Sequence, residues 1–168
     1  PLVPLALLAA CAGIAFKIAA FPFHMWVPDT YEAASTPFVA WLSVAPEAAG
    51  FVAPFRVYFE GMGDRASVWI PIAAGLAAIT IVAGNLMALP QQNTKRLLAY
   101  SGIAHIGYML VGFAAASVAG TAMILFYLVA YVFGNMGAFL VVEAVARSVR
   151  AEATAVLRGL AQPPALPS

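Results

Sequence analysis

Residues 69–89 read WIPIAAGLAAITIVAGNLMAL, an apolar run without a charged side chain. A helix needs about 20 mostly apolar residues to cross the hydrocarbon core of a bilayer. The strands of a transmembrane β-barrel would instead alternate apolar and polar side chains over about ten residues. This continuous run therefore predicts a transmembrane α-helix.

The composition of the whole chain leads to the same conclusion. Of the 168 residues, 64% are hydrophobic and 9% are charged, and the mean hydropathy is +0.93. Soluble domains carry about 25% charged residues, and disordered chains combine low hydrophobicity with high net charge, so both classes are excluded. The net charge of +1 shows no basic excess for nucleic acid. Cys11, the single cysteine, allows neither an intramolecular disulfide nor a cysteine zinc cluster.

Four further apolar runs bring the expected number of spans to about five, at residues 2–21, 34–59, 69–89, 97–116 and 118–146. We predict an all-α polytopic membrane helix bundle over residues 1–146. Turn-forming residues separate the spans at Pro28-Asp29, at 60–65 and at 90–93. Short connections predict antiparallel neighbours. Residues 147–168 are expected to form an amphipathic or disordered tail. The chain starts on an apolar run without Met, which suggests part of something longer.

Basic residues near the span ends predict the orientation, because they are enriched in cytoplasmic loops. Five basic residues lie on one side of the predicted bundle, and we place that side in the cytoplasm. The other side holds Arg56 and Arg65. The larger set comprises Lys95, Arg96, Arg147, Arg150 and Arg158.

Ionisable side chains inside the predicted spans are the candidate functional residues, because such groups are costly in hydrocarbon and mark ion or proton paths. Lys17 precedes the helix-breaking Pro22, and Glu47 directly follows Pro46. Both positions predict broken helices, which membranes tolerate only where the chain faces protein or water. For Lys17 the alternative is snorkelling to the membrane surface. For Glu47 it is a structural ion pair with Lys17 or Arg56.

Two polar stripes accompany these residues. Ser101, His105 and Tyr108 share one helix face, and His105 suits a proton relay or a hydrogen-bonded packing role. Tyr127, Tyr131 and Asn135, extended by Glu143, form a second stripe for which helix packing is the favoured role. Lys95 and Arg96 are explained by the positive-inside rule alone. Neither a phosphate loop nor a metal-ligand cluster is evident in the sequence, so we expect no metal site.

Several segments together resemble the antiporter-like subunits of respiratory complex I. They are residues 16–32 (FKIAAFPFHMWVPDTYE), 85–89 (NLMAL), 95–108 (KRLLAYSGIAHIGY) and 127–139 (YLVAYVFGNMGAF). The first two segments look most like the subunit N branch, that of NADH–quinone oxidoreductase. The resemblance covers residues 13–148, and it implies a middle fragment of a longer subunit.

The resemblance implies roles for individual residues in proton transfer. Lys17 matches the lysine on a broken helix that is regarded as a principal proton site. Lys95 matches the lysine that opens the third segment, and His105 falls where a histidine is common. Glu47 departs from the family, which usually has lysine there. A protonatable group is kept, but the usual transfer between lysines is put in doubt.

We therefore expect a proton-translocating membrane subunit of a complex I-type NADH:quinone oxidoreductase, using Lys17, Glu47, His105 and Lys95. The chain itself is expected to bind no cofactor, with flavin, iron–sulfur clusters and quinone in partner subunits. Expected partners are other membrane subunits, including further antiporter-like ones, in an energy-transducing membrane such as the bacterial plasma membrane. The alternatives are a related cation/proton antiporter, a membrane-bound hydrogenase subunit, or a non-pumping structural scaffold.

Overall fold

The structure, a computed structural model, describes the backbone of residues 2–161 and the side chains of this range except those of residues 2–4, 7, 64 and 152–161. Every secondary-structure element in this part of the chain is a helix, and none is a strand. Four helical stretches are long and apolar enough to cross a membrane, and a shorter apolar helix covers Leu8–Lys17. The predicted all-α polytopic bundle is thus confirmed.

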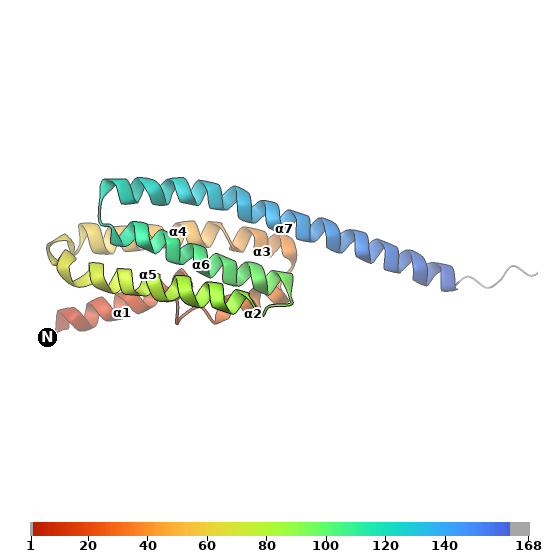
Figure 1. The fold of residues 1–168 in the computed structure, drawn as a ribbon, viewed down its shortest axis with the longest axis horizontal. Coiled ribbons are helices and arrows are strands. Elements are labelled where there is room, and N and C mark those ends of the chain that lie inside the picture. Colours follow the sequence, from red (N-terminus) through yellow and green to blue (C-terminus); the bar gives the residue numbers. More distant parts are fainter. Residues whose placement is uncertain (1, 162–168) are drawn as a thin grey trace, which may run out of the picture.

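The elements run along the long axis of the molecule, and the last helix extends well beyond the others (Figure 1). They are α1 (Leu2–Lys17), α2 (Trp26–Ala33), α3 (Thr36–Leu42), α4 (Ala45–Pro54), the π-helix η1 (Phe55–Glu60), the 3-10 turn η2 (Gly63–Arg65), α5 (Ala66–Ala88), α6 (Thr94–Ala114) and α7 (Val118–Ala161).

The first span is divided into two half-helices, α1 and α2, as predicted from Lys17 and Pro22. The predicted chain break at Pro28-Asp29, however, is wrong, because both residues lie in the first turn of α2. Proline is tolerated in the first turn of a helix, and an acidic residue there is favoured by the helix dipole. The interruption therefore lies at residues 18–25, and the span continues to Ala33.

The interruption at residues 18–25 is held by a neighbouring helix. Ala19 adopts the left-handed conformation with φ 57°. The backbone N–H of Phe21 donates to Oγ1 of Thr80 on α5 at 3.2 Å. Because backbone groups inside a membrane must find partners within the protein, the fully buried Thr80 side chain supports the broken helix.

The second span is also broken as predicted, between the end of α3 at Leu42 and the start of α4 at Ala45. Pro46 lies in the first turn of α4, where its missing N–H costs no helical hydrogen bond. At its other end α4 continues directly into the π-helix η1. Each of the first two spans is thus a pair of half-helices.

The later loops agree closely with the sequence pattern. Asn93 caps α6 by accepting hydrogen bonds from the backbone N–H groups of Lys95 and Arg96 at 2.9 and 3.4 Å. Helix α7 continues without a break past residue 146 to Ala161. The separate role of residues 147–168 as a tail stays a prediction, and residues 162–168 lie outside the described part.

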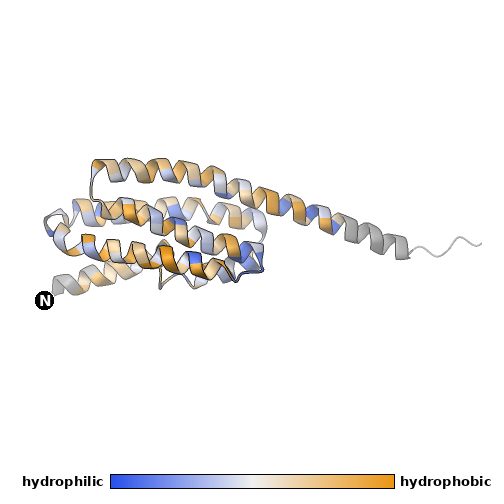
Figure 2. Ribbon diagram, in the orientation of Figure 1, coloured by the Kyte–Doolittle hydropathy of each residue, from blue (hydrophilic) through white to orange (hydrophobic). Residues whose placement is uncertain are grey.

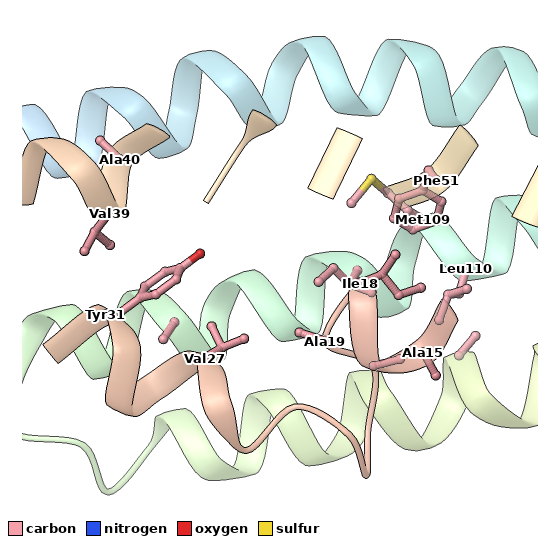
Figure 3. Packing of buried hydrophobic residues seen from close by; sticks show 14 of the residues in the cluster. Ala15, Ile18, Ala19, Val27, Tyr31, Val39, Ala40, Phe51, Met109 and Leu110 are labelled. Carbon is pink, nitrogen blue, oxygen red and sulfur yellow. The ribbon is translucent and has the colours of Figure 1, made fainter. Parts of the chain in front are cut away.

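Helices α5 and α6 form the most extensive helix pair. Gly84 permits their close approach, because a Cβ there would lie 2.7 Å from the backbone N of Ala104. The main core joins the two broken spans to α6, and Figure 3 shows Ile18, Phe51 and Met109 converging in it. Orange, apolar residues make up much of α5 and α7 (Figure 2), and many of their large apolar side chains are exposed, as a membrane-embedded bundle requires.

The charged residues gather at the two ends of the bundle. Lys95 and Arg150 line one cleft together with Glu32 and Glu143, whereas Arg65 lies in the turn before α5 at the opposite end (Figure 1). This separation agrees with the predicted charge asymmetry. Which end faces the cytoplasm stays a prediction, and the Arg158 side chain lies outside the described side chains.

Candidate functional site

Glu47 lies in the first turn of α4, immediately after the break in the second span. Its side chain is only 7% exposed, and its Oε2 atom has no hydrogen-bond partner among the described residues. The ion pairs formed by the described residues include neither Glu47–Lys17 nor Glu47–Arg56, so the proposed structural pair is not observed. A buried acidic group at membrane depth is a functional candidate by default.

Tyr131 on α7 supplies the side-chain hydrogen bond to the Glu47 carboxylate. The two groups meet beside Gly102 on α6. A Cβ at Gly102 would lie 3.1 Å from Tyr131 Oη and 3.9 Å from Glu47 Oε1. The absence of a side chain at Gly102 therefore leaves room for three helices to bring these groups together.

His105 lies next to this contact, on the same helix as Gly102. Its Nδ1 is 2.6 Å from Tyr127 Oη, and its ring centroid lies 5.2 Å from that of Tyr131. The Nδ2 of Asn135 donates to Tyr131 Oη at 3.2 Å. The two polar stripes thus come together, and the ring of Tyr108 joins them with its centroid 5.9 Å from that of His105 and 6.4 Å from that of Tyr127.

The hydrogen bonds of Tyr108 and Glu143 go to other residues. Tyr108 accepts a hydrogen bond from Asn85 at 3.3 Å, and Glu143 accepts one from Arg147 at 2.8 Å.

A groove of about 350 Å³ opens between α6 and α7 beside these residues. Its lining is Leu98, Ser101, His105, Tyr127, Ala130, Tyr131, Gly134, Asn135 and Ala138. The groove has the size and the polar groups to hold several waters. Its hydroxyl, imidazole and amide groups can donate and accept hydrogen bonds.

Lys17 is the last residue of α1. Its side chain is exposed in this chain, and its Cγ lies 3.8 Å from the position that a Cβ on Gly50 would take. Gly50 lies one helical turn after Glu47 and admits Ile18 from the break, whose Cγ2 would be 2.8 Å from such a Cβ. The two helix breaks are thus neighbours, and Lys17 contacts the helix that carries Glu47.

Lys95 lies apart from the Glu47 group, at the charged end of the bundle. Its Nζ donates to the carbonyl oxygen of Ala34 at 2.7 Å, just after α2. The neighbouring Arg96 pairs with Asp29 and Glu32 at 2.7 and 2.9 Å. Both basic residues therefore hold α2 to the start of α6. The positive-inside rule alone does not explain these contacts.

Sequence reasoning did not single out Gly102 or His24. A glycine in an apolar run gives no signal by itself. His24 lies in the interruption of the first span, 5% exposed, with Nδ1 lacking a hydrogen-bond partner among the described residues. Its ring stacks on Phe21 with centroids 5.1 Å apart. A histidine two residues after the helix-breaking Pro22 is the signal that the sequence offers. Within the described residues, no group of three or more His, Cys, Asp or Glu could hold a metal ion.

Comparisons with known proteins agree with the helical architecture. The sequence model of the family described as "NADH:quinone oxidoreductase/Mrp antiporter, TM" matches residues 2–167. NADH-quinone oxidoreductase subunit N of Moorella thermoacetica is 53% identical over 133 residues, covering 79% of this chain and 28% of the relative. The same subunit of Heliobacterium modesticaldum is 45% identical over 163 residues, covering 96% and 34%.

A third relative, NADH-quinone oxidoreductase subunit N 2 of Sorangium cellulosum, is 51% identical over 156 residues, which cover 89% of this chain and 31% of the relative. The chain thus spans about a third of the length of these curated relatives. With a family match along almost its whole length and four apolar helices that can span a bilayer, this multi-pass integral membrane protein belongs to the transmembrane family of NADH:quinone oxidoreductase and Mrp antiporter subunits.

Proposed function

We propose that this chain forms part of a proton channel in a complex I-type NADH:quinone oxidoreductase. The observation that carries the proposal is Glu47, a buried carboxyl group at a helix break whose second oxygen is unpartnered among the described residues. Relatives of the chain carry the name NADH-quinone oxidoreductase subunit N. This name supports a complex I-type enzyme over an antiporter or a hydrogenase. The plasma membrane of a bacterium is the proposed location.

The proposed path uses groups that lie at successive positions in the bundle. Lys17 lies at the end of α1 and Glu47 at the start of α4. Protons pass between these two side chains across the adjacent helix breaks. A change in the charge of a neighbouring subunit alters the proton affinity of both groups. Protons then pass between Glu47 and the groove that is lined by His105. Lys95 takes part in proton transfer at the charged end of the bundle.

Electron transfer takes place elsewhere in the proposed complex. Flavin, iron–sulfur clusters and quinone belong to partner subunits, which include further antiporter-like membrane subunits. This chain contributes protonatable side chains and a water-accessible groove.

The test is replacement of Glu47 in the full-length subunit, within the intact complex reconstituted into proteoliposomes. Glu47→Gln keeps the shape of the side chain but cannot carry a proton, so NADH-driven acidification should fall by at least about tenfold, since a positioned proton-transfer group contributes at least this much. Glu47→Lys restores a protonatable group of the type usual in the family and should keep measurable pumping.

Glu60→Gln is the matched control, because Glu60 is exposed at the end of η1 and should pump normally. Native gels with in-gel NADH oxidation check that each variant assembles. Unchanged pumping by an assembled Glu47→Gln complex would refute the channel and support a structural scaffold. Pumping that requires Na⁺ would instead favour the cation/proton antiporter.

A further inference from the structure

The geometry points to Tyr131 as the group that connects the buried Glu47 carboxyl to the groove that holds His105, an inference that rests on the proton-channel function proposed above. Glu47 does not line the groove, whereas Tyr131 does. Tyr131 also makes the side-chain hydrogen bond to Glu47. It is therefore the residue that contacts both the carboxyl group and the groove.

The hydrogen-bond partners of the Tyr131 hydroxyl group determine to which of them it donates its proton. A phenol has one proton to donate and two lone pairs that accept. Asn135 Nδ2 donates to Oη at 3.2 Å, which occupies a lone pair. The hydroxyl proton is thus left for the Glu47 carboxylate, on the side of the ring that faces α4.

This arrangement allows a balanced proton transfer. When Glu47 is ionised, the Tyr131 O–H gives its proton to the carboxylate and takes one from a protonated water in the groove. That water regains its charge from protonated His105, which ends the step as neutral imidazole. Tyrosine ends the step neutral, and Glu47 ends it as the acid. The reverse sequence releases the proton to the groove.

Gly102 determines whether the contact can form. Any side chain at this position would meet the Tyr131 hydroxyl, since its Cβ would already be 3.1 Å from Oη, and would stand 3.9 Å from Glu47 Oε1. A contact of 3.1 Å requires the hydroxyl to shift, because it is tighter than nearly all real Cβ contacts. Gly102 is therefore a positioning residue for Tyr131.

Tyr131→Phe in the reconstituted full complex tests the inference, because it keeps the ring packed against His105 and removes only the hydroxyl. Proton pumping per assembled complex should fall at least about tenfold, as for loss of a positioned proton-transfer group. The solvent deuterium isotope effect on the remaining rate should rise, since proton transfer becomes slower. A purely structural defect would lower the rate without raising the isotope effect.

Tyr100→Phe serves as the matched control, since Tyr100 lies on the other side of α6 against His24, and it should pump normally. Gly102→Ala keeps the hydroxyl but displaces it, so it should also lower the pumping rate. If Tyr131→Phe does not assemble, Gly102→Ala decides the matter, and normal pumping there overturns the inference.

The two proposals fail in different ways. Normal pumping by Tyr131→Phe together with a defective Glu47→Gln would overturn the role of Tyr131 and leave the channel in place. Normal pumping by both variants would overturn the channel itself. A slowed Tyr131→Phe variant with an unchanged isotope effect would reduce Tyr131 to a packing residue.

Discussion

At the scale of single residues, the proposed channel depends on the side-chain contact between Glu47 and Tyr131. Glu47 and His105 are conspicuous because ionisable groups are rare inside apolar runs. The contact between Glu47 and Tyr131 joins positions far apart in the chain, so no local pattern reveals it. The stripe that contains Tyr131 predicts helix packing, because a polar stripe more often packs against another helix than carries ions. Gly102 matters through the space it leaves, which only the assembled helices define.

Thr80 provides a prediction at this scale that concerns stability. Thr80→Val has nearly the same shape but cannot accept the hydrogen bond from Phe21 N–H. An unpaired buried N–H costs about 1–3 kcal/mol, so the melting temperature of the assembled complex should fall. Thr121→Val is the control, because the Thr121 hydroxyl donates locally, to the carbonyl oxygen of Ser117 just before α7. Equal melting temperatures for both variants would show that Thr80 does not support the break.

At the scale of elements, apolar length predicts about five spans, and the structure has four helical stretches long enough to cross a membrane and a shorter apolar helix at Leu8–Lys17. The loops around α5 and α6 lie where the turn residues predict them. Prolines alone did not locate the first interruption. Pro22 lies in the break, whereas Pro28 lies in the first turn of α2, and the two cannot be distinguished without knowing where the helix restarts. The half-helix α2 is short, with eight residues, so it depends on contacts with α6 for its position.

Arg96 gives the prediction for this element. Arg96→Ala removes both ion pairs that join α6 to α2, so it should lower the melting temperature of the complex and expose the α2 segment to proteolysis. Arg147→Ala removes an ion pair within one helix and should have a smaller effect. The difference should shrink at high salt, because exposed charges are screened. A larger effect of Arg147→Ala would contradict the role given to Arg96.

At the scale of the whole molecule, the bundle places two helix breaks, a buried acid and a polar groove close together, while many large apolar side chains are exposed. This combination supports water and protons crossing a membrane inside protein rather than through lipid. Composition was sufficient to predict the membrane location. The shared position of the breaks and the groove required the packing of α1, α4, α6 and α7.

The central claim is that the Glu47 carboxyl group gains and loses a proton while the complex works. Infrared difference spectroscopy of the intact complex, triggered by NADH, measures this directly through the C=O stretch of a protonated acid. We expect a carboxylic acid band that is lost in Glu47→Gln and kept in Glu60→Gln. Identical difference spectra for the wild-type and Glu47→Gln complexes would contradict it.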